Sequence, residues 1–297
     1  MKELLAAVDA CYKQGDGAGA EKLLRDALIT TTSPQARVTI YSELGGLYRT
    51  LSRYDESELA YERAIELLGV LGSSYALAKA TAQMNLAGTY RMRGDVRSAL
   101  ELFLQVKSEL EAGGNKNTAE YAATLNNLAL AYSADNRIDD AIHSAKAALA
   151  ALEAMGAGKR STAIANGNVA GLLVSAGEDD AAKEYIDKAI AIFETLEGKD
   201  GHYPSSLTTR ATLLWRRGER AKAVKDLEKA AEITLFYYGK NADWALNTAN
   251  LARMKNAVGD YDEACALMEE AIETYSKIFD SDDRRTSSLR AELESWR

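Results

Sequence analysis

Residues 125–148 read LNNLALAYSADNRIDDAIHSAKAA, and the fold prediction starts from the small residues in this stretch. Alanine stands 7 residues before Asn136, 5 residues after it and 12 residues after it, at Ala129, Ala141 and Ala148. Two packed helices can approach to about 8–10 Å only where the side chains between them are small. We therefore interpret Asn136 as the turn of a helix–turn–helix hairpin.

The same pattern recurs along the whole chain, and the turn residues from Gly94 onward are 42, 41, 41 and 41 residues apart. The seven predicted turn residues are Gly15, Ser52, Gly94, Asn136, Gly177, Gly218 and Gly259. The position 7 residues before each turn holds Val8, Gly45, Ala87, Ala129, Ala170, Ala211 and Ala252. A single hairpin of this kind cannot bury its apolar face alone, so the hairpins must stack on one another.

The repeats predict a single domain over residues 1–297. Its approximate units are 2–31, 34–71, 74–113, 117–157, 160–199, 203–241 and 243–280. Ser33-Pro34 predicts a helix start, because serine caps a helix N-terminus and proline fits its first turn. The apolar residues of the tail 282–297 predict a final helix that covers the last hairpin.

Composition limits the classes of partner. The chain has 297 residues with only 2 Pro, as long helices require, and its formal net charge is -8. This acidic balance argues against a nucleic acid or an anionic membrane surface as partner. No apolar stretch approaches the roughly 20 residues of a membrane-spanning helix. We therefore expect a soluble, cytoplasmic protein.

Tyr48, Tyr90 and Tyr132 stand late in the first helices of three hairpins, and with the small residues they resemble the tetratricopeptide repeat. The long period and the stretch 125–132 resemble the kinesin-light-chain subclass, as does the segment 198–204 with its Gly-His-Tyr-Pro. This resemblance implies an all-α, right-handed superhelical solenoid of about seven hairpins plus a C-terminal capping helix. It also implies that a partner docks in a concave groove lined by the first helices.

The sequence lacks the residue patterns of catalysis, metal binding and cofactor binding. His143 and His202 are the only histidines, and neither has a second ligand at metal-binding spacing. The glycine-rich stretch 15–19 follows a helix rather than a strand and lacks the ending of a phosphate-binding loop. We therefore expect no enzyme activity, no cofactor and no metal.

Asparagine recurs on the predicted groove face. Four of the seven residues that stand 9 positions before a turn are Asn85, Asn127, Asn168 and Asn250. A side-chain amide offers donors and an acceptor, so it can hold both polar groups of a peptide backbone. Similar asparagines grip peptides in the kinesin-light-chain-like families. The alternative, in which each amide bonds the neighbouring repeat and sets the stacking, stays open.

Basic and aromatic residues join the asparagines on this face, namely Arg49, Arg91, Trp215, Arg216 and Arg253. They predict a groove for an acidic segment with an aromatic or apolar anchor. Tetratricopeptide proteins that hold chaperone C-terminal tails use Lys and Arg near the start of successive first helices. The corresponding residues here are Thr81, Ala123, Ile164, Ser205 and Leu246. A two-carboxylate clamp is therefore not expected.

Together these patterns predict a non-catalytic scaffold or adaptor that binds an extended peptide or protein segment. Two alternatives stay open. One is a regulatory sensor that binds a signalling peptide or a small ligand, and the other is a self-assembling structural unit. The sequence does not give the identity of the partner or the oligomeric state.

Overall fold

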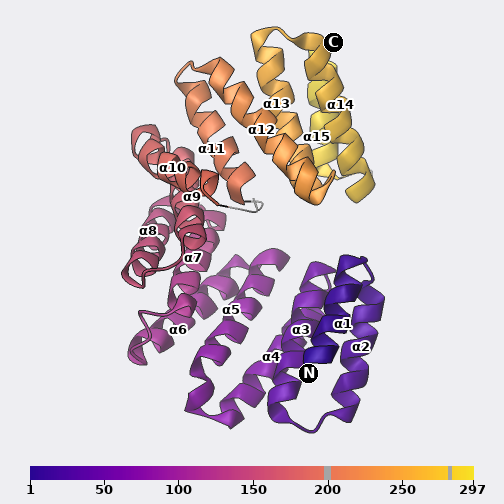
Figure 1. Cartoon of the computed structure of the whole chain (residues 1–297), viewed down its shortest axis with the longest axis vertical. Helices are drawn as coiled ribbons and strands as arrows, with labels where there is room; N and C mark the ends of the chain where they lie inside the picture. Colours follow the sequence, from indigo (N-terminus) through magenta and orange to yellow (C-terminus); the bar gives the residue numbers. More distant parts are fainter. Residues whose placement is uncertain (197–201, 280–282) are drawn as a thin grey trace. The chain divides into compact units, whose positions relative to one another are not determined.

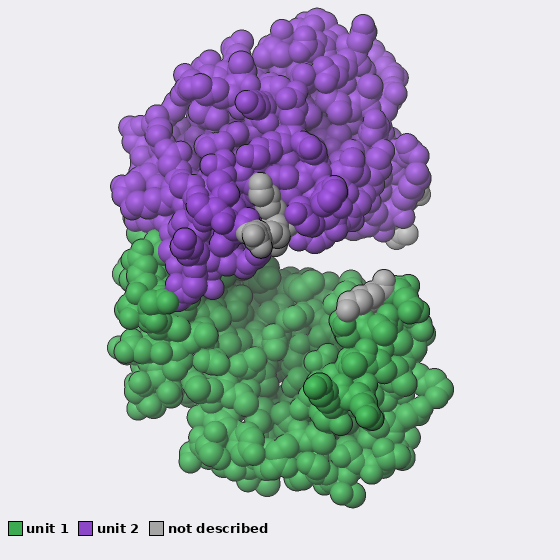
Figure 2. Space-filling view, in the orientation of Figure 1, with its two compact units in different colours: residues 1–156 green, residues 157–297 purple. Residues whose placement is uncertain are grey.

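The computed structural model describes residues 1–196, 202–279 and 283–297. Within these ranges all regular secondary structure is helical, and it forms two compact units, 1–156 and 157–297 (Figures 1 and 2). Unit 1 contains α1 (Lys2–Lys13), α2 (Gly17–Thr30), α3 (Pro34–Thr50), α4 (Tyr54–Leu71), the short 3-10 helix η1 (Ser73–Tyr75), α5 (Ala76–Arg93), α6 (Val96–Ala112), α7 (Ala119–Ala134) and α8 (Ile138–Ala154). Unit 2 contains α9 (Lys159–Ala176), α10 (Asp179–Glu194), α11 (His202–Arg216), α12 (Arg220–Tyr238), α13 (Ala242–Val258), α14 (Tyr261–Ile278) and α15 (Arg284–Trp296).

Consecutive helices pair into antiparallel hairpins, which stack within each unit (Figure 1). In unit 1 the hairpins are α1–α2, α3–α4, α5–α6 and α7–α8, and in unit 2 they are α9–α10, α11–α12 and α13–α14. The first helices of neighbouring hairpins also touch, because α5 contacts α3 and α7, and α9 contacts α11. The predicted all-α solenoid of helix hairpins is therefore confirmed.

The turns of the hairpins have the conformation that their residue types favour. All seven predicted turn residues have positive φ, from 58° at Ser52 to 97° at Gly259. The next backbone N–H then reaches back to a carbonyl of the first helix, as from Asp95 N to Tyr90 O at 2.9 Å. Glycine adopts this left-handed conformation without steric cost, which explains why five of the seven turns use it.

Helix α3 begins as predicted. The Ser33 hydroxyl accepts a hydrogen bond from the Ala36 N–H at 3.3 Å, and Pro34 is the first helical residue. The segment 198–204 is described only from His202 onward, where α11 begins, because residues 197–201 lie outside the described residues.

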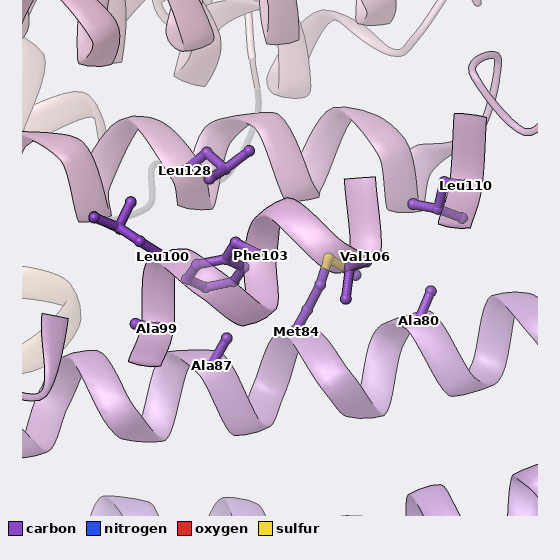
Figure 3. Packing of buried hydrophobic residues seen from close by; sticks show 10 residues of the cluster. Ala80, Met84, Ala87, Ala99, Leu100, Phe103, Val106, Leu110 and Leu128 are labelled. Atoms are coloured by element: carbon purple, nitrogen blue, oxygen red, sulfur yellow. The ribbon is translucent and has the colours of Figure 1, made fainter. Parts of the chain in front are cut away.

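The core of unit 1 shows why the repeat keeps three positions small. Ala87, Ala99 and Val106 have no measurable exposure, and α5 and α6 pack against each other at these residues (Figure 3). The small side chains leave room for Phe103, which is also fully buried and belongs to the same cluster as Leu128 of α7. Burying a phenylalanine side chain of this kind contributes about 2–3 kcal/mol to stability.

Helix α15 covers the end of unit 2. Leu289 and Leu293 are buried in one cluster with apolar residues of α13 and α14. The predicted capping helix is confirmed, and it spans Arg284–Trp296. Residue 282, where the predicted helix begins, and the predicted unit ends at 199 and 280 lie outside the described residues.

Candidate functional site

The candidate site lies on the faces formed by the first helices of the hairpins. We call the surface of α3, α5 and α7 the first-helix face of unit 1, and that of α9, α11 and α13 the first-helix face of unit 2. The residues 9 positions before the turns of these helices are all half-buried, and they are Glu43, Asn85, Asn127, Asn168, Thr209 and Asn250. Each face therefore presents one polar side chain per hairpin.

Asn85 and Asn127 stand at equivalent places on the neighbouring helices α5 and α7. Both are half-buried, and neither side-chain amide has a hydrogen-bond partner within the part of the chain that the structure describes. The two amides are therefore available to a ligand on the first-helix face of unit 1.

Arg49 of α3 connects two hairpins. Its Nη1 donates a hydrogen bond to the Asn85 carbonyl at 3.2 Å, and its guanidinium lies 5.9 Å from the centre of the Tyr61 ring. It passes over Gly88, where an added Cβ would lie only 3.1 Å from Nη1. Arg49 therefore stabilises the stacking of α3 on α5.

Arg91 of α5 stands at the place equivalent to Arg49 but makes different contacts. Its Nε is buried without a hydrogen-bond partner, and among the described residues no carboxylate lies within ion-pair distance of its guanidinium. Leu130 of α7 stands at the place equivalent to Gly88. Arg91 makes no hydrogen bond to a carbonyl of α7 within the described residues, and Leu130 is 39% exposed.

The predicted binding residues of unit 2 already form contacts with other residues of the chain. The Asn250 Oδ1 accepts a hydrogen bond from Arg253 Nη1 at 2.8 Å. Arg253 in turn donates from Nε to Glu292 Oε1 at 2.9 Å and from Nη2 to Glu292 Oε2 at 2.8 Å, which joins α13 to α15. Asn168 also has a contact within the chain.

Arg216 and Trp215 at the end of α11 also make contacts inside unit 2. Arg216 Nη1 donates to the Val174 carbonyl at 3.0 Å and to Asp179 Oδ1 at 2.6 Å. Trp215 packs against the buried cluster between α11, α12 and α13, with the Arg220 guanidinium 5.4 Å from its ring centre. The predicted residues of unit 2 thus lie on first helices, and the hydrogen bonds given above for them are made within that unit.

Two cavities on these faces involve residues that the sequence did not single out as binding residues. In unit 1 a cavity of about 420 Å³ is lined by Tyr12 of α1 and by Glu43, Gly46 and Arg49 of α3. Burial raises the pKa of the Tyr12 hydroxyl, and the nearby Glu43 carboxylate raises it further.

In unit 2 the cavity is about 680 Å³, and its lining is rich in hydroxyl and amide groups. The lining includes Ser205, Thr208, Tyr238 and Asn247, and the Thr208 hydroxyl lies 2.9 Å from Asn247 Oδ1. The available signal was the run of Ser and Thr in α11, which no known binding motif contains.

Among the described residues there is no group of three or more His, Cys, Asp or Glu side chains that could hold a metal ion. Within the same ranges no helix is both long and apolar enough to cross a membrane.

Several solved structures have a fold similar to that of this chain. A kinesin light chain from Podosopora anserina with nearly identical TPR-like repeats is 22% identical, with a TM-score of 0.57 over 70% of this chain and 99% of that chain. BtubC from P. vanneervenii is 18% identical, with a TM-score of 0.64 over 80% of this chain and 92% of that one. A Rap protein complexed with Competence and Sporulation Factor is 14% identical, with a TM-score of 0.64 over 94% and 82%. At these identities the likeness shows the fold alone.

Comparison with sequences identifies the family. No curated protein sequence matches the chain significantly. One tetratricopeptide repeat model matches residues 36–108 and 79–154, and a second matches residues 248–284, which together make up just over half of the chain. The chain therefore belongs to the tetratricopeptide repeat proteins, and its fold is similar to that of the kinesin-light-chain repeats named above.

Proposed function

We propose that this protein is a non-catalytic interaction scaffold that binds an extended segment of a protein or peptide on the first-helix face of unit 1. The observation that carries the proposal is that three half-buried side chains have polar groups without a hydrogen-bond or ion-pair partner in the described part of the chain. The amides of Asn85 and Asn127 and the guanidinium of Arg91 have no partner among the described residues. The Arg91 Nε is buried without a partner, which is costly, and the two half-buried amides have hydrogen-bonding groups that a ligand can engage.

The spacing of the amides suits an extended chain. Helices α5 and α7 are in contact, and packed helices lie about 8–10 Å apart. An extended chain advances about 3.3 Å per residue, so amides on neighbouring helices match backbone groups about three residues apart. Each amide can donate to a carbonyl and accept from an N–H, which binds the backbone without selecting side chains.

Arg91 adds a preference for an acidic segment. A guanidinium that has no carboxylate partner in the chain can form a charge-assisted, bidentate pair with an Asp or Glu of the ligand. Such a pair stabilises a complex more when it is partly desolvated, as it would be beside the buried Nε of Arg91. In unit 2 the predicted arginines already have partners, so we assign the acidic preference to unit 1.

Solved relatives of the same fold support ligand binding in general. The Rap protein structure was solved with Competence and Sporulation Factor bound. Competence and Sporulation Factor is the ligand of the Rap protein, and we do not propose it as a ligand of this chain.

The proposal is tested with matched variants in a pull-down from the native cell. The variant carries Asn85→Ala, Asn127→Ala and Arg91→Ala, and the control carries Asn117→Ala and Arg97→Ala at exposed positions away from the face. Circular dichroism first establishes that both variants fold like the wild type. A partner that the wild type and the control retain and the variant loses supports the proposal.

A partner that binds all three proteins equally well refutes the assignment of the face. If no partner is captured and light scattering shows that the purified chain forms a defined oligomer, self-assembly replaces the scaffold proposal.

One observation favours a second candidate function, that of a regulatory sensor that binds a signalling peptide or a small ligand. The cavity on the first-helix face of unit 2, at about 680 Å³, is of the size that holds a small ligand or a few peptide residues. Its hydroxyl and amide lining provides neutral donors and acceptors. Thr209→Val in the lining should then weaken ligand binding in unit 2 but leave the binding of a partner to unit 1 unchanged.

A further inference from the structure

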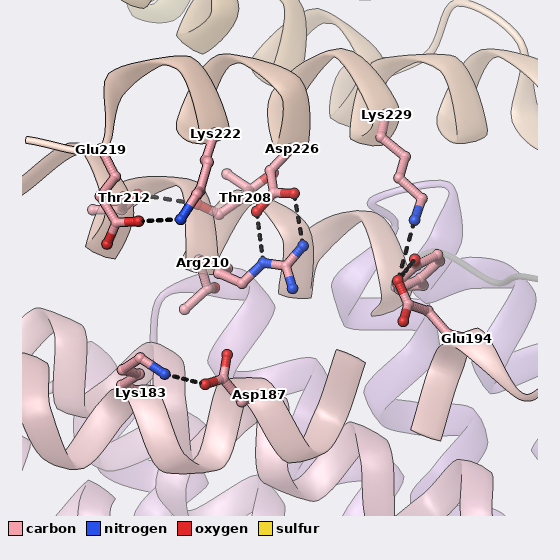
Figure 4. A network of polar contacts seen from close by, with 12 residues as sticks. Lys183, Asp187, Glu194, Thr208, Arg210, Thr212, Glu219, Lys222, Asp226 and Lys229 are labelled. Atoms are coloured by element: carbon pink, nitrogen blue, oxygen red, sulfur yellow. Dashed lines mark hydrogen bonds and ion pairs between the residues drawn. The ribbon is translucent and has the colours of Figure 1, made fainter. Parts of the chain in front are cut away.

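A second cavity in unit 2 lies away from the first-helix face. It has a volume of about 470 Å³ and is bounded by the second helices α10 and α12, with α11 between them (Figure 4). Helix α11 contributes Arg210, Leu213 and Leu214, which lie three or four residues apart along one side of the helix, and Arg217 follows the helix end. Thr209, which belongs to the first-helix face, is not part of this lining.

Positive charge gathers around this cavity. Six basic side chains line it, namely Lys183, Arg210, Arg217, Lys222, Lys225 and Lys229. Four acidic side chains also line it, so the cavity carries a net charge of about +2 in a chain whose formal net charge is -8. The basic groups come from three helices and therefore approach the cavity from three directions.

Arg210 is held in place at the base of the cavity. Its Nε donates to Asp226 Oδ2 at 2.6 Å and its Nη2 donates to Asp226 Oδ1 at 2.7 Å (Figure 4). Asp226 is 7% exposed, and the hydrogen bond with this carboxylate raises the pKa of the Arg210 guanidinium. The pair fixes the plane of the guanidinium, while Nη1 makes no hydrogen bond within the described residues and remains available to a ligand.

The other ion pairs at the cavity are easier to exchange. Lys222 of α12 pairs with Glu219, the N-cap residue of that helix, and Lys183 pairs with Asp187 within α10 (Figure 4). These pairs join exposed groups on one helix, which contribute little to stability. The Lys229 Nζ lies 3.4 Å from Glu194 Oε1. Arg217 pairs with the exposed Asp180, which does not belong to the lining.

Lys225 differs from the other basic residues of the lining described above, because it forms no ion pair in the described part of the chain. It has no acidic partner among the described residues. It stands three residues after Lys222 and four residues before Lys229, which are the spacings at which like charges on a helix repel each other. Lys225 is exposed, so this repulsion costs the helix little, and a bound anion would find the Lys225 ammonium without a competing carboxylate among the described residues.

We propose that this cavity binds a phosphate group. A phosphate carries close to two negative charges near neutral pH and has three oxygens that accept hydrogen bonds from several directions. Lys222 and Lys225 of α12, Arg210 Nη1 of α11 and Lys183 of α10 line the cavity and supply hydrogen-bond donors from three helices. The phosphate belongs either to a small phosphate ester or to a phosphorylated side chain of a partner. This site is independent of the proposed scaffold function.

The direct test is calorimetric titration with inorganic phosphate at constant ionic strength. The wild type should bind saturably, and the double variant Lys222→Gln, Lys225→Gln should bind about tenfold more weakly, because each charge-assisted hydrogen bond contributes strongly to affinity. The control is Lys188→Gln, which removes an exposed lysine of α10 outside the lining. Absence of saturable binding, or an equal loss in the control, overturns the proposal.

A stability measurement separates a binding role from a structural one. Lys225→Gln removes two like-charge repulsions on α12, so its thermal midpoint without phosphate should equal or slightly exceed that of the wild type. A clear decrease in midpoint would show that Lys225 stabilises the fold, and the proposal would fail.

The two sources of phosphate are separated by titrating glycerol 2-phosphate and a short phosphoserine peptide. The probe that binds more tightly than inorganic phosphate identifies the source. If both bind more weakly than inorganic phosphate, the cavity does not recognise phosphate esters and the proposal is wrong.

Discussion

Two helical glycines with opposite surroundings give a quantitative test of the packing. Gly45 of α3 is buried, and a Cβ added there would lie 2.7, 2.8 and 2.9 Å from three atoms of the Tyr61 ring. Gly171 of α9 has no atom within 4 Å of the place where its Cβ would lie. Replacing either residue with alanine has the same effect on helix propensity, so any difference between the variants reports packing.

The expected magnitudes follow from two opposing terms. Alanine is favoured over glycine in a helix by about 1 kcal/mol. At Gly171 nothing opposes this gain, so Gly171→Ala should raise the free energy of unfolding by about 0.5–1 kcal/mol. At Gly45 the overpacking cost of about 1–3 kcal/mol exceeds the gain. The Tyr61 ring cannot move away easily, because it is only 1% exposed.

Gly45→Ala should therefore lower the free energy of unfolding by about 1 kcal/mol. The assay is urea unfolding followed by circular dichroism. With a slope of about 2 kcal/mol per molar urea, the midpoints of the two variants should differ by about 1 M. Equal stabilisation by both substitutions would refute the reasoning, because it would mean that the Tyr61 ring does not require glycine at position 45.

Three further predictions concern other parts of the chain. Phe103→Ala should lower the free energy of unfolding by about 3–5 kcal/mol in the same urea assay, because the cavity it leaves is fully enclosed. Burial and the hydrogen bond with Glu111 raise the pKa of Tyr121 from its ordinary value of 10.0 to about 12. The stability from this tyrosine is complete below pH 10 and is lost as the pH rises toward 12, so Tyr121→Phe should reduce the alkaline loss in a pH series of thermal melts. Glu292→Gln should weaken the link to Arg253 by about 1 kcal/mol, which hydrogen exchange would detect as faster exchange of the α15 amides.

The hairpins could be predicted from the sequence because their constraints act on residue type. A turn with positive φ selects glycine or asparagine, and a close helix contact selects alanine, so each leaves a mark that repeats every 41 or 42 residues. Serine does not by itself indicate a turn with positive φ, so only the repeat period predicts that Ser52 is a turn residue. Its φ of 58° agrees with that prediction.

The binding residues were harder to predict because their roles depend on neighbours that are distant in sequence. Asn250 and Asn127 stand at equivalent places in the repeat, yet Asn250 accepts a hydrogen bond from Arg253 whereas Asn127 has no partner among the described residues. The difference arises because Arg253 replaces Leu130 at the place three residues further along the helix. The period identifies equivalent positions, but it does not say what surrounds each of them.

The pair Arg49 and Arg91 shows that residues at equivalent places in the repeat can make different contacts. Both arginines stand three residues before a turn, and the sequence treats them as equivalent. Arg49 passes over Gly88 and bonds the carbonyl of Asn85, so its charge helps to hold two hairpins together. Leu130 stands in the place of Gly88 on the next helix, and Arg91 keeps its charge without a carboxylate partner in the described structure. Two arginines at equivalent places in the repeat thus differ in role, because one hydrogen-bonds the next hairpin and the other has no carboxylate partner among the described residues.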